Sequence, residues 1–117
     1  MNRFSKTWTE PKRATPETLL KKAVKQYLAL RGWKCFHNLQ SLGSFRGIPD
    51  LTAVRRFPFP GPSDSLLSVA NRTLWIECKS KNGKLSLFQQ AFQKMIEDAG
   101  GEYLVVRDIQ DLIDSGI

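Results

Sequence analysis

The stretch TLWIECK, residues 73–79, decides the fold of this chain. Successive residues of a β-strand point to opposite faces of a sheet, so its side chains divide into two sets. One set is apolar and belongs in a core: Leu74, Ile76 and Cys78. The other set contains Trp75 together with Glu77 and Lys79, a carboxylate and an ammonium group two residues apart. The stretch therefore predicts a strand with one buried face and one chemically active face.

The sequence after this strand predicts a helix, a further strand and a short helix. A turn at 82–83 (Asn-Gly) leads to Ser86, which we expect to open the first of these helices. Its expected apolar face recurs at helical spacing: Phe88, Ala91, Phe92, Met95, Ile96 and Ala99. Residues 100–101 (Gly-Gly) end the helix. Residues 102–106 (EYLVV) are then expected to form a strand and residues 109–113 a helix.

The sequence before residue 73 opens with a longer predicted helix that ends at Gly32. Thr15 is a suitable cap, Pro16 suits the first helical position, and Glu17 lies at the positive end of the helix dipole. The expected apolar face consists of Leu19, Leu20, Ala23, Val24, Tyr27 and Leu30. The basic residues Lys21, Lys22, Lys25 and Arg31 are expected to occupy the opposite face.

Two strands and a long connection are expected between this helix and residue 73. The strands are predicted over 33–39 and 48–54, the second of them starting at Pro49, where a missing backbone donor is tolerated. Residues 56–72 are interpreted as a connection. It contains a proline-rich insertion over 57–65, which suits neither a helix nor a continuing strand.

A length of 117 residues suits one domain. Residues 1–15 contain four basic residues and one acid without periodicity, and we interpret them as a basic N-terminal arm. Residues 16–117 are expected to form a single domain. Its fold class is α/β, in the order α-β-β-β-α-β-α, with a mixed sheet of about four strands flanked by helices.

The composition indicates the kinds of partner to expect. A formal net charge of +7 and a pI of about 9.7 suggest a polyanion, because basic side chains release counterions when they meet phosphates. An apolar run long enough for a membrane span is missing, as is the apolar core of a secretory signal. Cys35 and Cys78 are expected to be buried free thiols. These features favour a cytoplasmic location.

A candidate site follows from the position of Asp50 at the start of the strand that precedes 73–79. If the two strands are neighbours, Asp50 approaches Glu77, and two acids at such a distance repel unless they share a proton or a cation. Oxygen ligands suit Mg²⁺, for which Mn²⁺ can substitute. Lys79 would orient or deprotonate a water, or offset charge in the transition state. The combination predicts hydrolysis of a phosphodiester bond.

Each residue also has a plainer structural interpretation. Asp50 could be a solvated acid after a proline, and Glu77 with Lys79 could form a surface ion pair that contributes at most about 1 kcal/mol. His37, the only histidine, could act as a general base or could be an ordinary strand residue.

Four stretches of the chain resemble one nuclease family. GIPDL (47–51) followed by IECK (76–79) resembles the PD-(D/E)XK signature. GKLSLFQ (83–89) is similar to the continuation found in the VRR-NUC branch, and the glycine pair with YLVV (103–106) is similar to the closing strand of that branch. The resemblance covers most of residues 16–113.

The resemblance implies a restriction-endonuclease-like core, dependence on Mg²⁺ or Mn²⁺ without a small-molecule cofactor, and DNA as substrate. Stand-alone members of the branch occur in phages and bacteria, resemble Holliday-junction resolvases and act as dimers, which implies branched DNA and a homodimer here. By the same resemblance, the metal ligands would be Asp50, Glu77, the backbone carbonyl of Cys78 and Glu17. Gln89 would complete the catalytic set. The proline-rich insertion and the cysteine between Glu77 and Lys79 depart from the family pattern.

Basic residues near the motifs are candidate DNA contacts: Arg46, Lys81, Lys84, Lys12 and Arg13. Two other functions stay open. The chain could be a non-catalytic nucleic-acid-binding module on the same fold, or an enzyme that acts on RNA. The sequence shows no aromatic pair with the spacing of an RNA-binding platform, which argues against an enzyme that acts on RNA.

Overall fold

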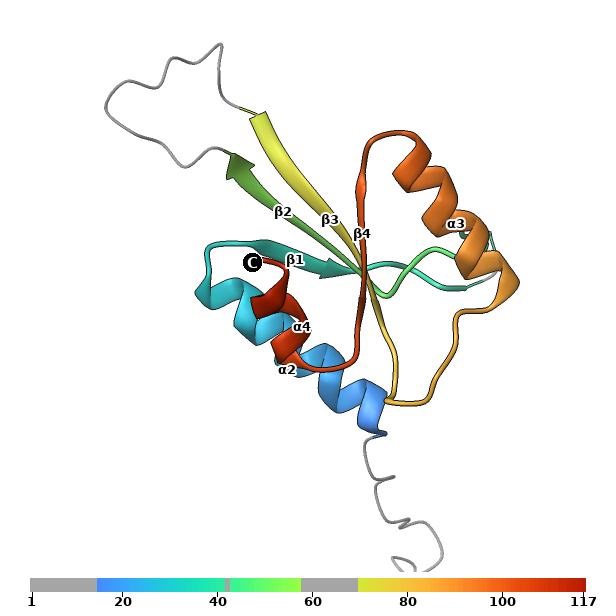
Figure 1. The fold of residues 1–117 in the computed structure, drawn as a ribbon, viewed down its shortest axis with the longest axis horizontal. Coiled ribbons are helices and arrows are strands. Elements are labelled where there is room, and N and C mark those ends of the chain that lie inside the picture. The colour runs from blue at the N-terminus through green and yellow to red at the C-terminus, as the bar shows by residue number, and fades with distance from the viewer. Residues whose placement is uncertain (1–14, 42, 58–69) are drawn as a thin grey trace, which may run out of the picture.

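The computed structural model describes residues 15–41, 43–57 and 70–117 (Figure 1). In chain order, the elements are α2 (Pro16–Leu30), β1 (Lys34–His37), β2 (Leu51–Phe57), β3 (Ala70–Cys78), α3 (Leu87–Asp98), β4 (Glu102–Val106) and α4 (Ile109–Asp114). The fold is α/β, and the predicted order of helices and strands is confirmed.

The strands form one four-stranded mixed sheet in the order β1-β2-β3-β4. β1 pairs with β2, and β2 with β3, in antiparallel orientation, whereas β3 and β4 are parallel. Helices lie on both faces: α2 and α4 pack together on one side and α3 covers the other (Figure 1). In the described part of the chain, no helix is both long and apolar enough to cross a membrane.

β3 is the central strand that residues 73–79 predicted. Leu74, Ile76 and Cys78 are at most 1% exposed and lie in the core with Val24 and Leu28 of α2 and Leu112 of α4, which confirms the predicted apolar face. Both cysteines are free, Cys78 buried and Cys35 half-buried.

β2 begins and ends three residues later than predicted. Residues 48 and 49 do not join the ladder, and their carbonyl groups accept hydrogen bonds from side chains instead: Gln40 Nε2 donates to Ile48 O at 2.8 Å and Asn38 Nδ2 to Pro49 O at 3.0 Å. At its other end β2 continues to Phe57, which pairs with Ala70 at the start of β3.

The prediction that residues 56–72 form a connection is therefore wrong at both ends, where the chain is strand. Residues 58–65 of the predicted insertion lie outside the described residues. β1 is likewise shorter than the predicted 33–39, because Asn38 turns its side chain toward the segment before β2.

The helix caps are as predicted. Thr15 Oγ1 accepts a hydrogen bond from Thr18 N at 3.1 Å, and Ser86 forms a reciprocal capping box with Gln89. The predicted apolar faces are only partly right. In α3 Phe92 is buried and Ile96 half-buried, while the other members are exposed: Phe88, Ala91, Met95 and Ala99. In α2 Leu19 and Leu30 are exposed, and Leu28 is buried instead.

Candidate active site

Asp50 and Glu77 are brought together by the register of β2 and β3. Leu51 is paired with Ile76 in this antiparallel ladder, so the next residues outward on the two strands are Asp50 and Glu77. Both side chains are buried, with 6% and 3% of their surface exposed. Few acids are buried to this extent without a specific partner, so the contacts of each carboxylate define what the site can do.

Asp50 is held by the main chain of β3 and by a lysine from α2. Its Oδ2 accepts a hydrogen bond of 2.9 Å from Cys78 N, and Lys21 Nζ lies 3.1 Å from Oδ1. Asn38 orders the same segment, because its backbone N–H donates to Asp50 O at 2.9 Å and its Oδ1 accepts from the hydroxyl of Thr52 at 3.0 Å. The Asp50 carboxylate is therefore held from two elements, β3 and α2, and its backbone is held by Asn38.

Glu77 has two partners on one oxygen and none on the other. Gln89 Nε2 donates to Glu77 Oε1 at 3.0 Å, and Lys79 Nζ lies 3.8 Å from the same oxygen. Glu77 Oε2 is buried and has no hydrogen-bond partner among the described residues. Burial, followed by the negative charge of Asp50, raises the pKa of Glu77 from 4.5 to about 7, although Lys79 acts in the opposite direction. The Glu77 carboxylate therefore has unused capacity to bind a cation.

An aromatic cluster covers the Glu77 face of the sheet and accounts for this burial. Phe92 of α3 packs edge-on against Trp75 and Phe45, with ring centroids 5.4 and 5.5 Å apart, and lies 6.5 Å from the ring of Tyr103. Burial and the charge of Glu77 raise the pKa of the Tyr103 hydroxyl well above its usual range. Glu77 therefore shares its face of β3 with Trp75, a member of this aromatic cluster.

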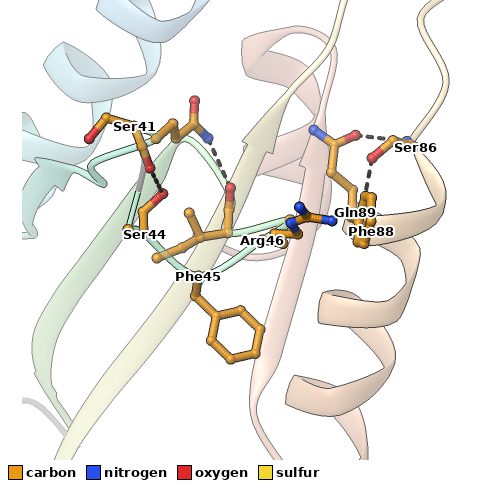
Figure 2. Close-up of a pocket in the computed structure, with 11 residues that line it drawn as sticks. Ser41, Ser44, Phe45, Arg46, Ser86, Phe88 and Gln89 are labelled. Carbon is orange, nitrogen blue, oxygen red and sulfur yellow. Dashed lines mark hydrogen bonds between the residues drawn. The ribbon is translucent and has the colours of Figure 1, made fainter.

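Gln89 links the start of α3 to Glu77. Its Oε1 accepts from Ser86 N at 2.8 Å within the capping box (Figure 2). This leaves the amide nitrogen to donate to Glu77. One side chain therefore both caps the helix and contacts the acid pair. Figure 2 shows Ser86 and Gln89 side by side at this helix end.

Arg46 lines a pocket of about 440 Å³ together with Ser86, Phe88 and Gln89 (Figure 2). Its guanidinium carbon is 4.9 Å from the centroid of the exposed Phe88 ring. Gly47, with φ +79°, allows this close approach, because a Cβ at position 47 would overlap the backbone oxygen of Phe88. The pocket therefore lies beside the acid pair and has a cation at its edge.

Glu17 lies near the acid pair but contacts the chain after it. Its Oε1 accepts from Ser80 N at 3.2 Å, which ties the first turn of α2 to the residue after Lys79. Within residues 15–41, 43–57 and 70–117, no three acidic, histidine or cysteine side chains form a metal-binding group. Asp50 and Glu77 are thus the carboxylates that the structure pairs, and a metal-binding role for Glu17 stays a prediction.

The remaining predicted residues are dispersed. Lys81 and Lys84 are exposed in the loop between β3 and α3, and Lys12 and Arg13 lie outside the described residues. His37 is exposed at the end of β1 and lines a separate groove on α2.

Two contributors were missed from the sequence. Lys21 was expected on the solvent side of its helix, yet its ammonium group binds Asp50. Its spacing of one helical turn from Glu17 was the available signal, because residues four apart share a helix face. Arg107 was the second. Its Nη1 donates to Ser80 O at 2.6 Å and to Gly83 O at 2.7 Å, which orders the loop after Lys79. A single arginine after β4 does not predict, from the sequence, a contact with the loop after Lys79.

Comparison with known proteins gave no relative. A scan against protein-family models found no match, and searches of curated proteins and of solved structures found none either.

Proposed function

We propose that this protein is a metal-dependent phosphodiester hydrolase. The observation that supports this most directly is the buried pair of Asp50 and Glu77, with Lys79 beside it. One carboxylate oxygen of Glu77 has no donor among the residues that the structure describes. Burial, followed by the negative charge of Asp50, raises the pKa of Glu77 to about 7, so holding both carboxylates charged in the metal-free site is unfavourable. A divalent cation would offset the two negative charges, and carboxylate oxygens are the ligands that Mg²⁺ and Mn²⁺ prefer.

More specifically, we propose a DNA endonuclease of the PD-(D/E)XK type, similar to the VRR-NUC branch, on a restriction-endonuclease-like core. Three features support this choice. An acid precedes β2, a Glu-X-Lys sequence ends β3, and Gln89 of α3 donates to the glutamate of that sequence. The four-stranded mixed sheet with helices on both faces is compatible with such a core.

The donor set fits a hard divalent cation. Asp50, Glu77 and the backbone carbonyl of Cys78 would hold it, leaving the other positions to water and a phosphate oxygen. Bound there, Mg²⁺ would supply a Lewis acid that polarises the scissile phosphate and lowers the pKa of a water molecule.

The residues of the chain complete the chemistry. Gln89 holds Glu77 Oε1, so that Oε2 is the oxygen available to a cation. Lys79 is within reach of the same region, with Nζ 3.8 Å from Oε1, and would orient the attacking water or stabilise charge in the transition state. Glu77 is 3% exposed, and such burial strengthens these interactions because the local dielectric is low.

DNA is the substrate that the charge favours, because a net charge of +7 suits a polyanion. We further propose that the enzyme cuts branched DNA, such as a four-way junction, as a homodimer. Such a reaction requires two cuts related by a two-fold axis. One chain supplies one acid pair, and symmetric pairing supplies the second.

A cleavage panel tests the proposal. Linear duplex, nicked, flap, splayed and four-way DNA are incubated with Mg²⁺ or Mn²⁺. Asp50→Ala and Lys79→Ala should abolish cutting while DNA binding persists, and Glu97→Ala and Lys94→Ala, which change exposed residues of α3, should cut normally. Full activity of either site variant, or undiminished cutting in excess EDTA, would refute the proposal. Binding without any cutting would identify a non-catalytic module, and cutting of RNA alone would identify a ribonuclease.

A further inference from the structure

A second concave surface lies on α2, away from the aromatic cluster. It is a groove of about 390 Å³ lined by Thr18, Lys21, Lys22, Lys25, Gln26 and His37. Three of the six lining residues are lysines and, among the described residues that line it, none is acidic. A concave surface of this composition is suited to an anionic ligand.

The lysines of the groove differ in how their charge is used. Lys21 is paired with Asp50, whereas Lys22 and Lys25 form no ion pair within the described residues. By contrast, Lys94 on α3 lies 2.8 Å from Asp98 of its own helix. The groove therefore presents two uncompensated ammonium groups next to one that is engaged at the acid pair.

The lysines of the groove form a row along α2. Lys21 and Lys25 are one turn apart on α2, about 6 Å along the helix axis. Because Lys21 contacts Asp50, the row of lysines begins at the acid pair and leads away from it. Lysine side chains combine aliphatic stems with charged ends, and such a lining suits the sugar and phosphate groups of a nucleic acid strand.

We propose that this groove binds the sugar-phosphate backbone of the DNA strand that flanks the scissile phosphate, with Lys22 and Lys25 as the phosphate contacts. The inference rests on the proposed nuclease function, because it takes DNA as the ligand and the acid pair as the point of cleavage. It adds a surface on α2 to the candidate DNA contacts that were predicted in the loops near the motifs.

Binding measurements without metal test the groove separately from catalysis. The double variant Lys22→Gln/Lys25→Gln is compared with wild type and with Lys94→Gln, whose lysine is already compensated by Asp98. Fluorescently labelled duplex and single-stranded DNA are titrated in EDTA over a range of salt concentrations. Thermal unfolding checks that all proteins are folded.

The double variant should bind roughly tenfold more weakly than wild type at about 50 mM salt. The slope of log affinity against log salt should become shallower by about 2 for duplex DNA, one unit for each lost phosphate contact. Lys94→Gln should match wild type in both measurements. Unchanged affinity and slope in the double variant would overturn the proposal, as would a loss of binding to phosphatidylserine vesicles with DNA binding intact.

These outcomes distinguish a failure of the groove proposal from a failure of the proposed nuclease function. If wild type cuts DNA with Mg²⁺ and the double variant binds as wild type does, the groove is refuted and the nuclease function stands. If the double variant loses DNA binding but no protein cuts any DNA, the groove is supported and the nuclease function fails.

Discussion

Gln89 Nε2 and Glu77 Oε1 are 3.0 Å apart, and through this hydrogen bond the first turn of α3 determines which oxygen of Glu77 is left without a donor. The other end of the Gln89 amide accepts from Ser86 N, so the side chain cannot rotate without breaking the capping box. A helix cap is thereby used to orient an acid of the candidate active site.

The first prediction concerns this link. In Gln89→Glu the new carboxylate can still accept from Ser86 N, but it loses the donor to Glu77 and adds a negative charge beside it. The cleavage rate should therefore fall roughly 10- to 100-fold, as for other residues that orient metal ligands. Gln90→Glu is the matched control, because Gln90 is exposed and donates to Leu85 O. A wild-type cleavage rate in Gln89→Glu would contradict the prediction.

The second prediction concerns Lys21. In Lys21→Met the buried Asp50 carboxylate loses its ion pair at Oδ1, which should lower the free energy of unfolding of the metal-free protein by about 1–3 kcal/mol. Added Mg²⁺ should restore more stability to the variant than to wild type, because the cation then meets a less compensated carboxylate pair. Thermal unfolding with and without Mg²⁺ measures both effects. Lys22→Met removes a lysine of the same helix that forms no ion pair within the described part of the chain, and it should unfold like wild type. An equal response to Mg²⁺ in Lys21→Met and wild type would contradict the prediction.

The third prediction is a pH dependence of stability that comes from Glu77. Its pKa is about 7 in the folded protein and returns to about 4.3 in the unfolded chain. Between these values the folded state binds a proton that the unfolded state does not. The contribution of Glu77 to the free energy of unfolding therefore decreases as pH rises through this window, by a total on the order of 1–3 kcal/mol.

Denaturant titrations of the metal-free protein from about pH 4.5 to pH 7.5 test this dependence. Glu77→Gln should lack the decrease. The free energy of unfolding of the variant, relative to that of wild type, should therefore be higher near pH 7.5 than near pH 4.5. Glu97→Gln, which changes an exposed acid of α3, should follow wild type. Parallel pH curves for wild type and Glu77→Gln would show that the pKa of Glu77 is ordinary.

The fourth prediction concerns the close approach of Gly47 to α3. Gly47 and Gly43 both have positive φ, +79° and +94°, so alanine is strained at either position by about 1–2 kcal/mol. Only at 47 would the added Cβ also overlap a backbone oxygen, that of Phe88. Gly47→Ala should therefore destabilise the protein clearly more than Gly43→Ala in urea unfolding, and it should also weaken metal binding by moving Asp50. Equal losses of stability would rule out the steric part of this account.

Local sequence signals determined much of this protein. The alternation of residues 73–79 predicted which side chains of β3 are buried, and Thr15 and Ser86 marked the starts of α2 and α3. These features depend on neighbours within a few residues, so they can be read from spacing alone. The order of helices and strands followed from them.

Only the tertiary structure decided where the long-range partners lie. That Asp50 is next to Glu77 depends on the pairing of Leu51 with Ile76, and β2 itself begins after residues 48 and 49, whose carbonyl groups accept from the side chains of Gln40 and Asn38. Periodicity shows that a helix has an apolar face but not how wide a strip its neighbours cover, so Phe88 and Met95 were wrongly expected to be buried. For the same reason Lys21 was expected in solvent. Its contact with Asp50 exists because α2 packs across the sheet at that end, a relation between residues 29 positions apart that no local pattern encodes.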